Sequence, residues 1–144
     1  DIYTEFIGEN PLDPFRNLND EGRKKVLEYI SLLEKSGEYE KALYTTSLGV
    51  ATGFTKILNI VTKRNPVFEY KDLKSLLDEV SNYSDIVQWG IDNSLWESFN
   101  SFAECAFKNG DSVFASTLYK ILSESNPEPY WREDAKLKAQ DLLF

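Results

Sequence analysis

Apolar residues recur at helical spacing along most of this sequence, and no segment shows the sustained two-residue alternation of a half-buried strand. The helical runs stop at residues that end helices, at Gly37, at Asn65-Pro66 and at Asn109-Gly110. The pattern therefore predicts an all-α protein of about seven helices. Because short turns join them, neighbouring helices should lie antiparallel, as stacked helical hairpins in a small array or bundle.

The expected helices cover residues 20–36, about 38–63, 73–82, 84–90, 94–108, a stretch after 111 and a stretch after 129. Gly49 and Gly53 could divide the second of these, since each costs about 1 kcal/mol relative to alanine inside a helix. Ser84 or Asp85 can cap the fourth helix, which should be broken near Gly90. A capping box, Ser-x-x-Glu, is predicted at residues 94–97.

The chain has 144 residues, which is enough for one domain, 1–144. Residues 1–18 contain two prolines among scattered apolar residues, and they are expected to form an irregular N-terminal arm that lies against the body. Asn17 or Asn19 is available to cap the first helix.

The formal net charge is −8, which argues against nucleic acid or an anionic membrane surface as the main partner. One cysteine permits no internal disulfide, and no secretory signal is visible, so a cytoplasmic location is expected. The stretch 42–61 has only Lys56 charged and carries Gly49-x-x-x-Gly53, the spacing of some membrane helices. Its threonines favour a soluble core helix over a membrane span.

The chain contains no histidine, which removes the commonest general base and the commonest metal ligand together. Cys105 lies on a helical apolar face, and a buried inert thiol is expected there. Neighbouring carboxylates such as Asp78 and Glu79 diverge on a helix. We therefore expect no enzyme activity, no catalytic residue, no metal and no cofactor. A carboxylate-dependent hydrolase remains an alternative, and it requires two carboxyl groups that converge in a deep pocket.

Acidic residues concentrate in the middle of the chain, where residues 65–110 contain 8 acidic and 3 basic side chains interleaved with aromatic ones. Aromatic side chains anchor protein interfaces, and carboxylates steer a basic partner. The candidate partner-binding residues are Asp78, Glu79, Tyr83, Asp85, Trp89, Asp92 and Glu97. They suggest a small acidic inhibitor or immunity-type protein that occludes the basic active site of a partner such as a nuclease toxin. In the simpler alternative, the tryptophans are core residues and the carboxylates keep the surface soluble.

Two predicted hairpins share a local pattern. Gly37 and Gly110 each follow a lysine by two residues, and each precedes an alanine, Ala42 or Ala115, by five. This pattern resembles the tetratricopeptide (TPR) family, a helix–turn–helix repeat of about 34 residues with a turn glycine and small residues where the helices cross. The better match is 99–127, and the resemblance covers about half of the chain.

The resemblance implies a protein-binding scaffold, and so an alternative function as an adaptor or sensor that binds a peptide in a groove between hairpins. Tyr44 and Tyr119 are its candidate contacts. No turn occurs near residues 71–76, where a middle repeat would need one, so an ordinary helical bundle with the same punctuation stays open. Nothing in the sequence indicates the oligomeric state.

Overall fold

The computed structural model describes residues 20–142, and the side chains of residues 28–142. The expected arm at 1–18 and the caps Asn17 and Asn19 lie outside the described residues. Within 20–142 the secondary structure consists of seven helices and no strand, so the all-α prediction is confirmed. The helices are α2 (Asp20–Lys35), α3 (Tyr39–Arg64), α4 (Leu73–Val80), α5 (Ser84–Asp92), α6 (Leu95–Lys108), α7 (Ser112–Ser125) and α8 (Pro129–Leu142).

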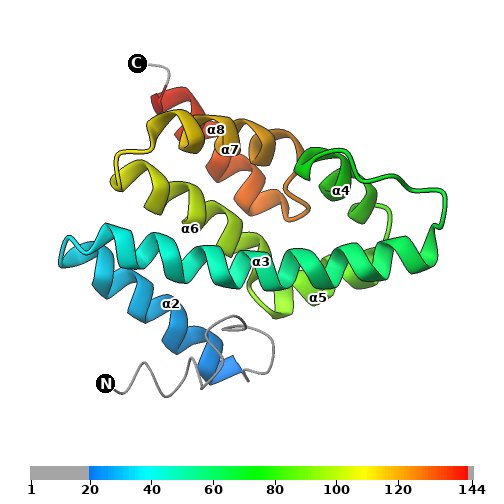
Figure 1. Cartoon of the computed structure of the whole chain (residues 1–144), viewed down its shortest axis with the longest axis horizontal. Coiled ribbons are helices and arrows are strands. Elements are labelled where there is room, and N and C mark those ends of the chain that lie inside the picture. The colour runs from blue at the N-terminus through cyan, green and yellow to red at the C-terminus, as the bar shows by residue number, and fades with distance from the viewer. Residues whose placement is uncertain (1–19, 143–144) are drawn as a thin grey trace.

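Helix α3 is the longest of these, with 26 residues, and it runs across the molecule (Figure 1). The main core lies between α3, α6, α7 and α8, with α4 and α5 closing one end; its large buried members include Ile57, Leu76, Leu77, Trp96, Phe99 and Leu122. A smaller cluster joins α2 to α3 and α6 through Ile30, Leu33, Ala42 and Cys105. Helix α2 therefore packs at the N-terminal end of α3, and α5 lies toward its other end (Figure 1).

The two hairpin turns are built alike, as their shared sequence predicts. Gly37 and Gly110 have φ of 79° and 92°, the left-handed conformation that favours glycine. The amide after each glycine reaches back to the helix that has just ended, because Glu38 N donates to Leu33 O at 2.8 Å and Asp111 N donates to Ala106 O at 2.8 Å. These Schellman turns reverse the chain and start α3 and α7.

Two local predictions are wrong, and a third is imprecise. Helix α5 ends at Asp92, two residues past Gly90, and Gly90 itself lies inside the helix, where its missing Cβ leaves room for the indole of Trp96. The predicted capping box is absent: Ser94 has φ 56° and ψ 29° and its side chain makes no cap hydrogen bond. Helix α5 also starts without a side-chain cap, with Tyr83 at the N-cap position instead of Ser84 or Asp85.

A capping box does occur at the start of α4, where the sequence analysis did not place one. Ser75 N donates to Asp72 Oδ1 at 2.8 Å, and Asp72 N donates to Ser75 Oγ at 3.2 Å. The two side chains thus satisfy free amides at the first turn of this eight-residue helix. The signal in the sequence is Asp-x-x-Ser, a variant of the pattern sought at 94–97.

Helix α3 is a single helix through Gly49 and Gly53, which answers the question of whether 42–61 forms one helix or two. Gly53 is buried against Leu95, the first residue of α6, so close packing offsets its weak helix propensity. In the described part of the chain, no helix is sufficiently long and apolar to cross a bilayer.

A buried polar network fastens α6 to the connection between α7 and α8. Asn126 is fully buried, and its Nδ2 donates to Asn100 Oδ1 at 3.0 Å and to Trp96 O at 3.3 Å. Its Oδ1 accepts from Glu128 N at 3.0 Å. Asn100 Nδ2 in turn donates to Trp131 O on α8 at 2.8 Å. Asn126 thus bridges two segments of backbone and Asn100 connects α6 to the first turn of α8, which sets where α8 begins.

Candidate functional site

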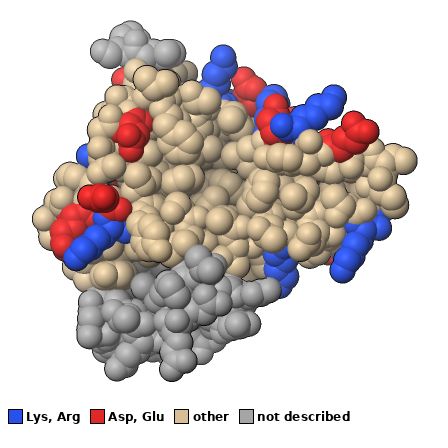
Figure 2. Space-filling model, viewed as in Figure 1, with Lys and Arg blue, Asp and Glu red and all other residues tan. Residues whose placement is uncertain are grey.

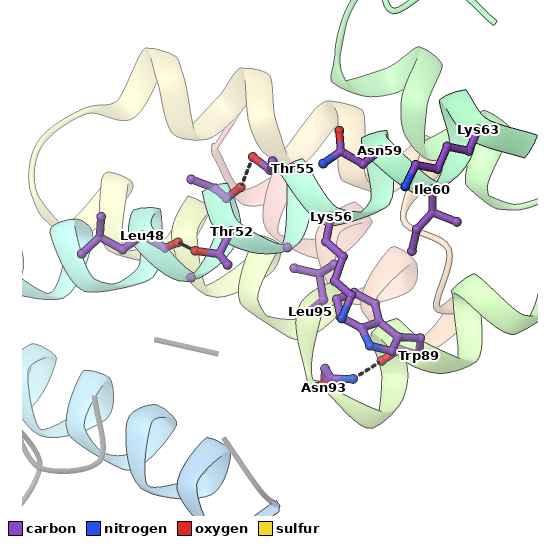
Figure 3. A pocket seen from close by; sticks show the side chains of 13 residues that line it. Leu48, Thr52, Thr55, Lys56, Asn59, Ile60, Lys63, Trp89, Asn93 and Leu95 are labelled. Carbon is purple, nitrogen blue, oxygen red and sulfur yellow. Dashed lines mark hydrogen bonds between the residues drawn. The ribbon is translucent and has the colours of Figure 1, made fainter. Parts of the chain in front are cut away.

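A groove of about 630 Å³ lies along one face of α3, on the side that faces α5 (Figure 3). Most of its wall comes from α3, between Leu48 and Lys63, and the opposite wall comes from Trp89 on α5, from Asn93 and from Leu95. This volume is within the usual range of ligand and peptide sites. The groove therefore joins two helices that are separated in the sequence by residues 65–83, which include the whole of α4.

Small residues keep the groove open. Helix α3 places Gly49, Ala51, Thr52 and Gly53 along it, so its middle turns carry little side-chain bulk on this face. Leu95 closes the wall behind Gly53, where an added Cβ would lie 2.3 Å from Leu95 Cδ1. The hollow thus depends on the absence of large side chains on α3 as much as on the position of α5.

The polar groups of the groove are mostly held in place. Thr52 Oγ1 donates to Leu48 O at 2.9 Å, and Thr55 Oγ1 donates to Ala51 O at 3.0 Å, both within α3 (Figure 3). Asn93 Nδ2 donates to Trp89 O at 2.8 Å, which ties the end of α5. The threonine hydroxyl protons are therefore committed to the helix.

The charged side chains that line the groove are Lys56 and Lys63. Lys56 Nζ lies 4.7 Å from the centre of the Trp89 ring, a cation–π contact that connects α3 to α5 (Figure 3). Figure 2 shows the side of the molecule where α3 crosses, and its surface there is largely uncharged, with acidic and basic groups mostly at the margin. The groove is thus locally basic in a chain whose net charge is −8.

Three of the predicted site residues come together around Arg64. Glu79 Oε1 accepts from Tyr83 Oη at 3.1 Å, and the Arg64 guanidinium lies over the Tyr83 ring at 5.5 Å. Arg64 Nη1 donates to Asp85 Oδ1 at 2.7 Å in a two-bond pair, and this contact lowers the pKa of Asp85 to about 2. Burial and the Glu79 carboxylate raise the pKa of Tyr83.

The other predicted site residues have separate neighbours. Asp78 accepts from Lys74 Nζ at 3.1 Å, and this lysine also reaches Ser125 on α7. Asp92 accepts from Gln88 Nε2 at 2.9 Å. Trp89 lines the groove. The seven residues are therefore divided among several local groups, and several of their carboxylates already have partners within the chain.

Glu97 has a different environment from the rest. Burial raises its pKa, and the negative charge of Glu128 raises it further. The pKa of this carboxyl group is higher in the folded state than in the unfolded state, so the unfolded chain ionises first as the pH rises. The free energy of unfolding therefore falls between the pKa of the unfolded state and that of the folded state. Glu97 is thus a half-buried acid rather than the helix cap that its spacing predicts.

Glu97→Gln should therefore raise the free energy of unfolding at pH 7, and the gain should vanish below about pH 4, where wild-type Glu97 is protonated in both states. Urea unfolding at pH 7 and pH 3.5 measures this difference. Glu69→Gln, at an exposed position, is the matched control and should show no comparable gain. A Glu97→Gln protein that is less stable than wild type at pH 7 would contradict the conclusion that ionised Glu97 disfavours the folded state.

Cys105 is buried, as predicted. Burial and the Glu34 carboxylate raise the pKa of its thiol, and Sγ donates to Glu34 Oε1 at 3.4 Å. Lys108 also donates to Glu34, so this cluster ties α2 to α6. Within the described residues, no group of three or more cysteines and carboxylates is placed to hold a metal ion.

The groove residues were missed as a site by the sequence analysis. Thr52, Lys56, Asn59 and Lys63 recur every three or four positions, which places them on one helical face. That polar stripe was the available signal, and it was used only to argue against a membrane span. Trp89 was predicted as a contact residue for a basic partner, and in the structure Lys56 of α3 lies over its ring.

The comparisons with known proteins yield one weak relative. A protein from Treponema pallidum (strain Nichols), whose name is "Uncharacterized protein", is 22% identical to this chain over 113 residues. The match covers 78% of this chain and 30% of that protein, so the chain spans about a third of its relative's length. No family model and no solved structure matches the chain.

Proposed function

We propose that this protein is a non-catalytic binding module that takes a segment of a partner protein into the groove between α3 and α5. The observation that carries the proposal is the groove itself, about 630 Å³ in volume, with small residues on α3 and an aromatic wall on α5. Grooves between helices are a recurring mode of peptide recognition. Trp89, half-buried at the edge, provides the kind of aromatic anchor that dominates such interfaces.

This proposal is the adaptor alternative with different contact residues. Tyr119 is 2% exposed beneath Lys138 of α8, so it is no contact residue, and Tyr44 is exposed but does not line the groove. The proposal of a TPR-like scaffold is supported by the matching turns at Gly37 and Gly110. The non-catalytic character is supported by the protonated thiol of Cys105 and the lack of histidine in the chain.

The inhibitor hypothesis stays a prediction. Asp85 and Asp92 are exposed and could meet a basic partner. Asp85, however, is paired with Arg64, so a basic partner would have to replace that guanidinium. The groove is a preformed hollow with a half-buried aromatic side chain at its edge, and we therefore favour it.

Selection from a displayed library of random 18-residue peptides on the full chain tests the proposal. Ala51→Trp, at an exposed position on α3, fills the groove, and Thr117→Trp on α7 is the matched control outside it. We expect selected peptides to bind wild type and Thr117→Trp equally and to lose at least tenfold in affinity for Ala51→Trp. The acidic surface is tested in parallel with Asp85→Lys/Asp92→Lys.

Peptides that bind Ala51→Trp as tightly as wild type would overturn the groove proposal. If the same peptides were lost on Asp85→Lys/Asp92→Lys and bound more weakly at high salt, the acidic inhibitor hypothesis would replace it.

A further inference from the structure

We propose that the segment bound in the groove is an acidic amphipathic helix whose carboxylates pair with Lys56 and Lys63. This inference rests on the proposed function, since it names the partner chemistry of the same groove. The groove residues on α3 extend from Leu48 to Lys63, a length of about 22 Å, or four helical turns.

The first step is the charge of the groove. Lys56 and Lys63 both line it, and among the described residues neither ammonium is paired with a carboxylate. Five other lysines of the described residues have carboxylate partners within 4 Å, Lys41, Lys74, Lys108, Lys136 and Lys138, whereas Lys35, Lys71 and Lys120, outside the groove, have none. The two groove lysines thus remain available to an anionic partner, and a basic segment would meet unfavourable charge there.

The second step is the backbone of the occupant. Both long walls of the groove are helices, whose amides and carbonyls are already paired within each helix, so the groove presents no strand edge for an extended peptide. The Thr52 and Thr55 hydroxyl protons are also committed to α3. An occupant that satisfies its own backbone groups fits this surface best, and a helix does so.

The third step is spacing. Lys56 and Lys63 are seven residues apart, so they lie on the same face of α3 with a separation of about 10 Å. Two carboxylates at positions i and i+7 of a partner helix have the same separation. Beyond the carboxylate that pairs with Lys56, apolar side chains of that helix would face Gly49, Gly53 and Leu95, where the small residues of α3 allow close approach.

The test uses three synthetic 18-residue helical peptides with the same alanine and leucine scaffold and with Glu, Gln or Lys at positions 6 and 13. Each is titrated into the ¹⁵N-labelled full chain at 0.1 M salt, where screening confines charge effects to about 10 Å. The observed signals are the amides of Lys56 and Lys63 and the indole of Trp89. We expect the Glu peptide to shift these signals and to bind about tenfold more tightly than the Gln peptide, with the Lys peptide weakest.

Lys56→Glu/Lys63→Glu should reverse the order, so that the Lys peptide binds most tightly. Lys35→Glu/Lys120→Glu makes the same change in net charge at exposed positions outside the groove and should leave the order unchanged. This control separates pairing in the groove from the charge of the whole protein.

Equal affinity for the Glu and Gln peptides would overturn the acidic preference while leaving the groove as a binding site. If none of the three peptides shifted these signals, the acidic-helix inference would fail, and the library selection would decide the proposed function separately. If 10 mM inorganic phosphate shifted these signals and the Glu peptide did not, the acidic-helix inference would be overturned, and the groove lysines would instead bind a small anion.

Discussion

Asn126→Ala should lower the free energy of unfolding by about 3 kcal/mol. The side chain of Asn126 is fully buried and makes hydrogen bonds to Asn100 Oδ1, to Trp96 O and from Glu128 N. Alanine would remove the side chain that makes these hydrogen bonds. The buried groups of Asn100, Trp96 and Glu128 that faced it would then have neither a protein partner nor water. Because buried polar groups without partners cost more than their hydrogen bonds contributed, the loss should exceed that of an ordinary surface change.

Urea unfolding of the wild type and the variant measures this loss. Asn82→Ala, at an exposed turn position between α4 and α5, is the matched control and should change stability by less than about 0.5 kcal/mol. Equal effects of the two substitutions would show that the network does not hold α6 against the start of α8.

Gly90→Ala should destabilise the protein by about 2 kcal/mol, although alanine is the better helix former. A Cβ at this position would lie 2.2 Å from Trp96 Cε2, in the ring of a fully buried side chain. Trp96 Nε1 donates to Val87 O at 2.9 Å, so the indole cannot move away without losing that bond. The clash must therefore be relieved by shifting α5 relative to α6.

Gly53→Ala is the matched control. Its Cβ would come as close to a neighbouring side chain, but that neighbour is a leucine methyl group instead of an indole ring. The neighbour is Leu95 Cδ1 at 2.3 Å, the end of a flexible side chain that can change rotamer. The gain in helix propensity, about 1 kcal/mol, should offset most of the remaining strain. Thermal or urea unfolding of both variants tests the contrast, and a Gly90→Ala protein as stable as Gly53→Ala would refute it.

The helices and the hairpin turns could be predicted because their signals are local. Gly37 and Gly110 adopt positive φ, and Asn65-Pro66 ends α3 at Arg64, all from the conformational preferences of a few adjacent residues. Gly90 shows where this reasoning stops. A glycine can also stand inside a helix, where the lack of a Cβ lets another element pack closely against it. For Gly90 that neighbour is Trp96, which lies beyond the end of α5.

Side-chain roles were harder to predict than helices. Leu137 on α8 is apolar but 64% exposed, because helical periodicity does not show where a helix meets the core. Glu97 has the sequence of a cap and the environment of a half-buried acid beside Glu128, which lies 31 positions away. Such a pairing leaves no trace in the local pattern.

The sequence by itself determined that this chain is helical, where its hairpins turn and that its one thiol is buried, because these follow from spacing and backbone preference over a few residues. Only the tertiary structure decided which surfaces remain open. The groove exists because α2 and α5 pack toward opposite ends of α3 and the turns of α3 between them carry small residues such as Gly49, Ala51 and Gly53. Charge pairing was decided in the same way, since Arg64 meets Asp85 only when α5 folds back beside the end of α3.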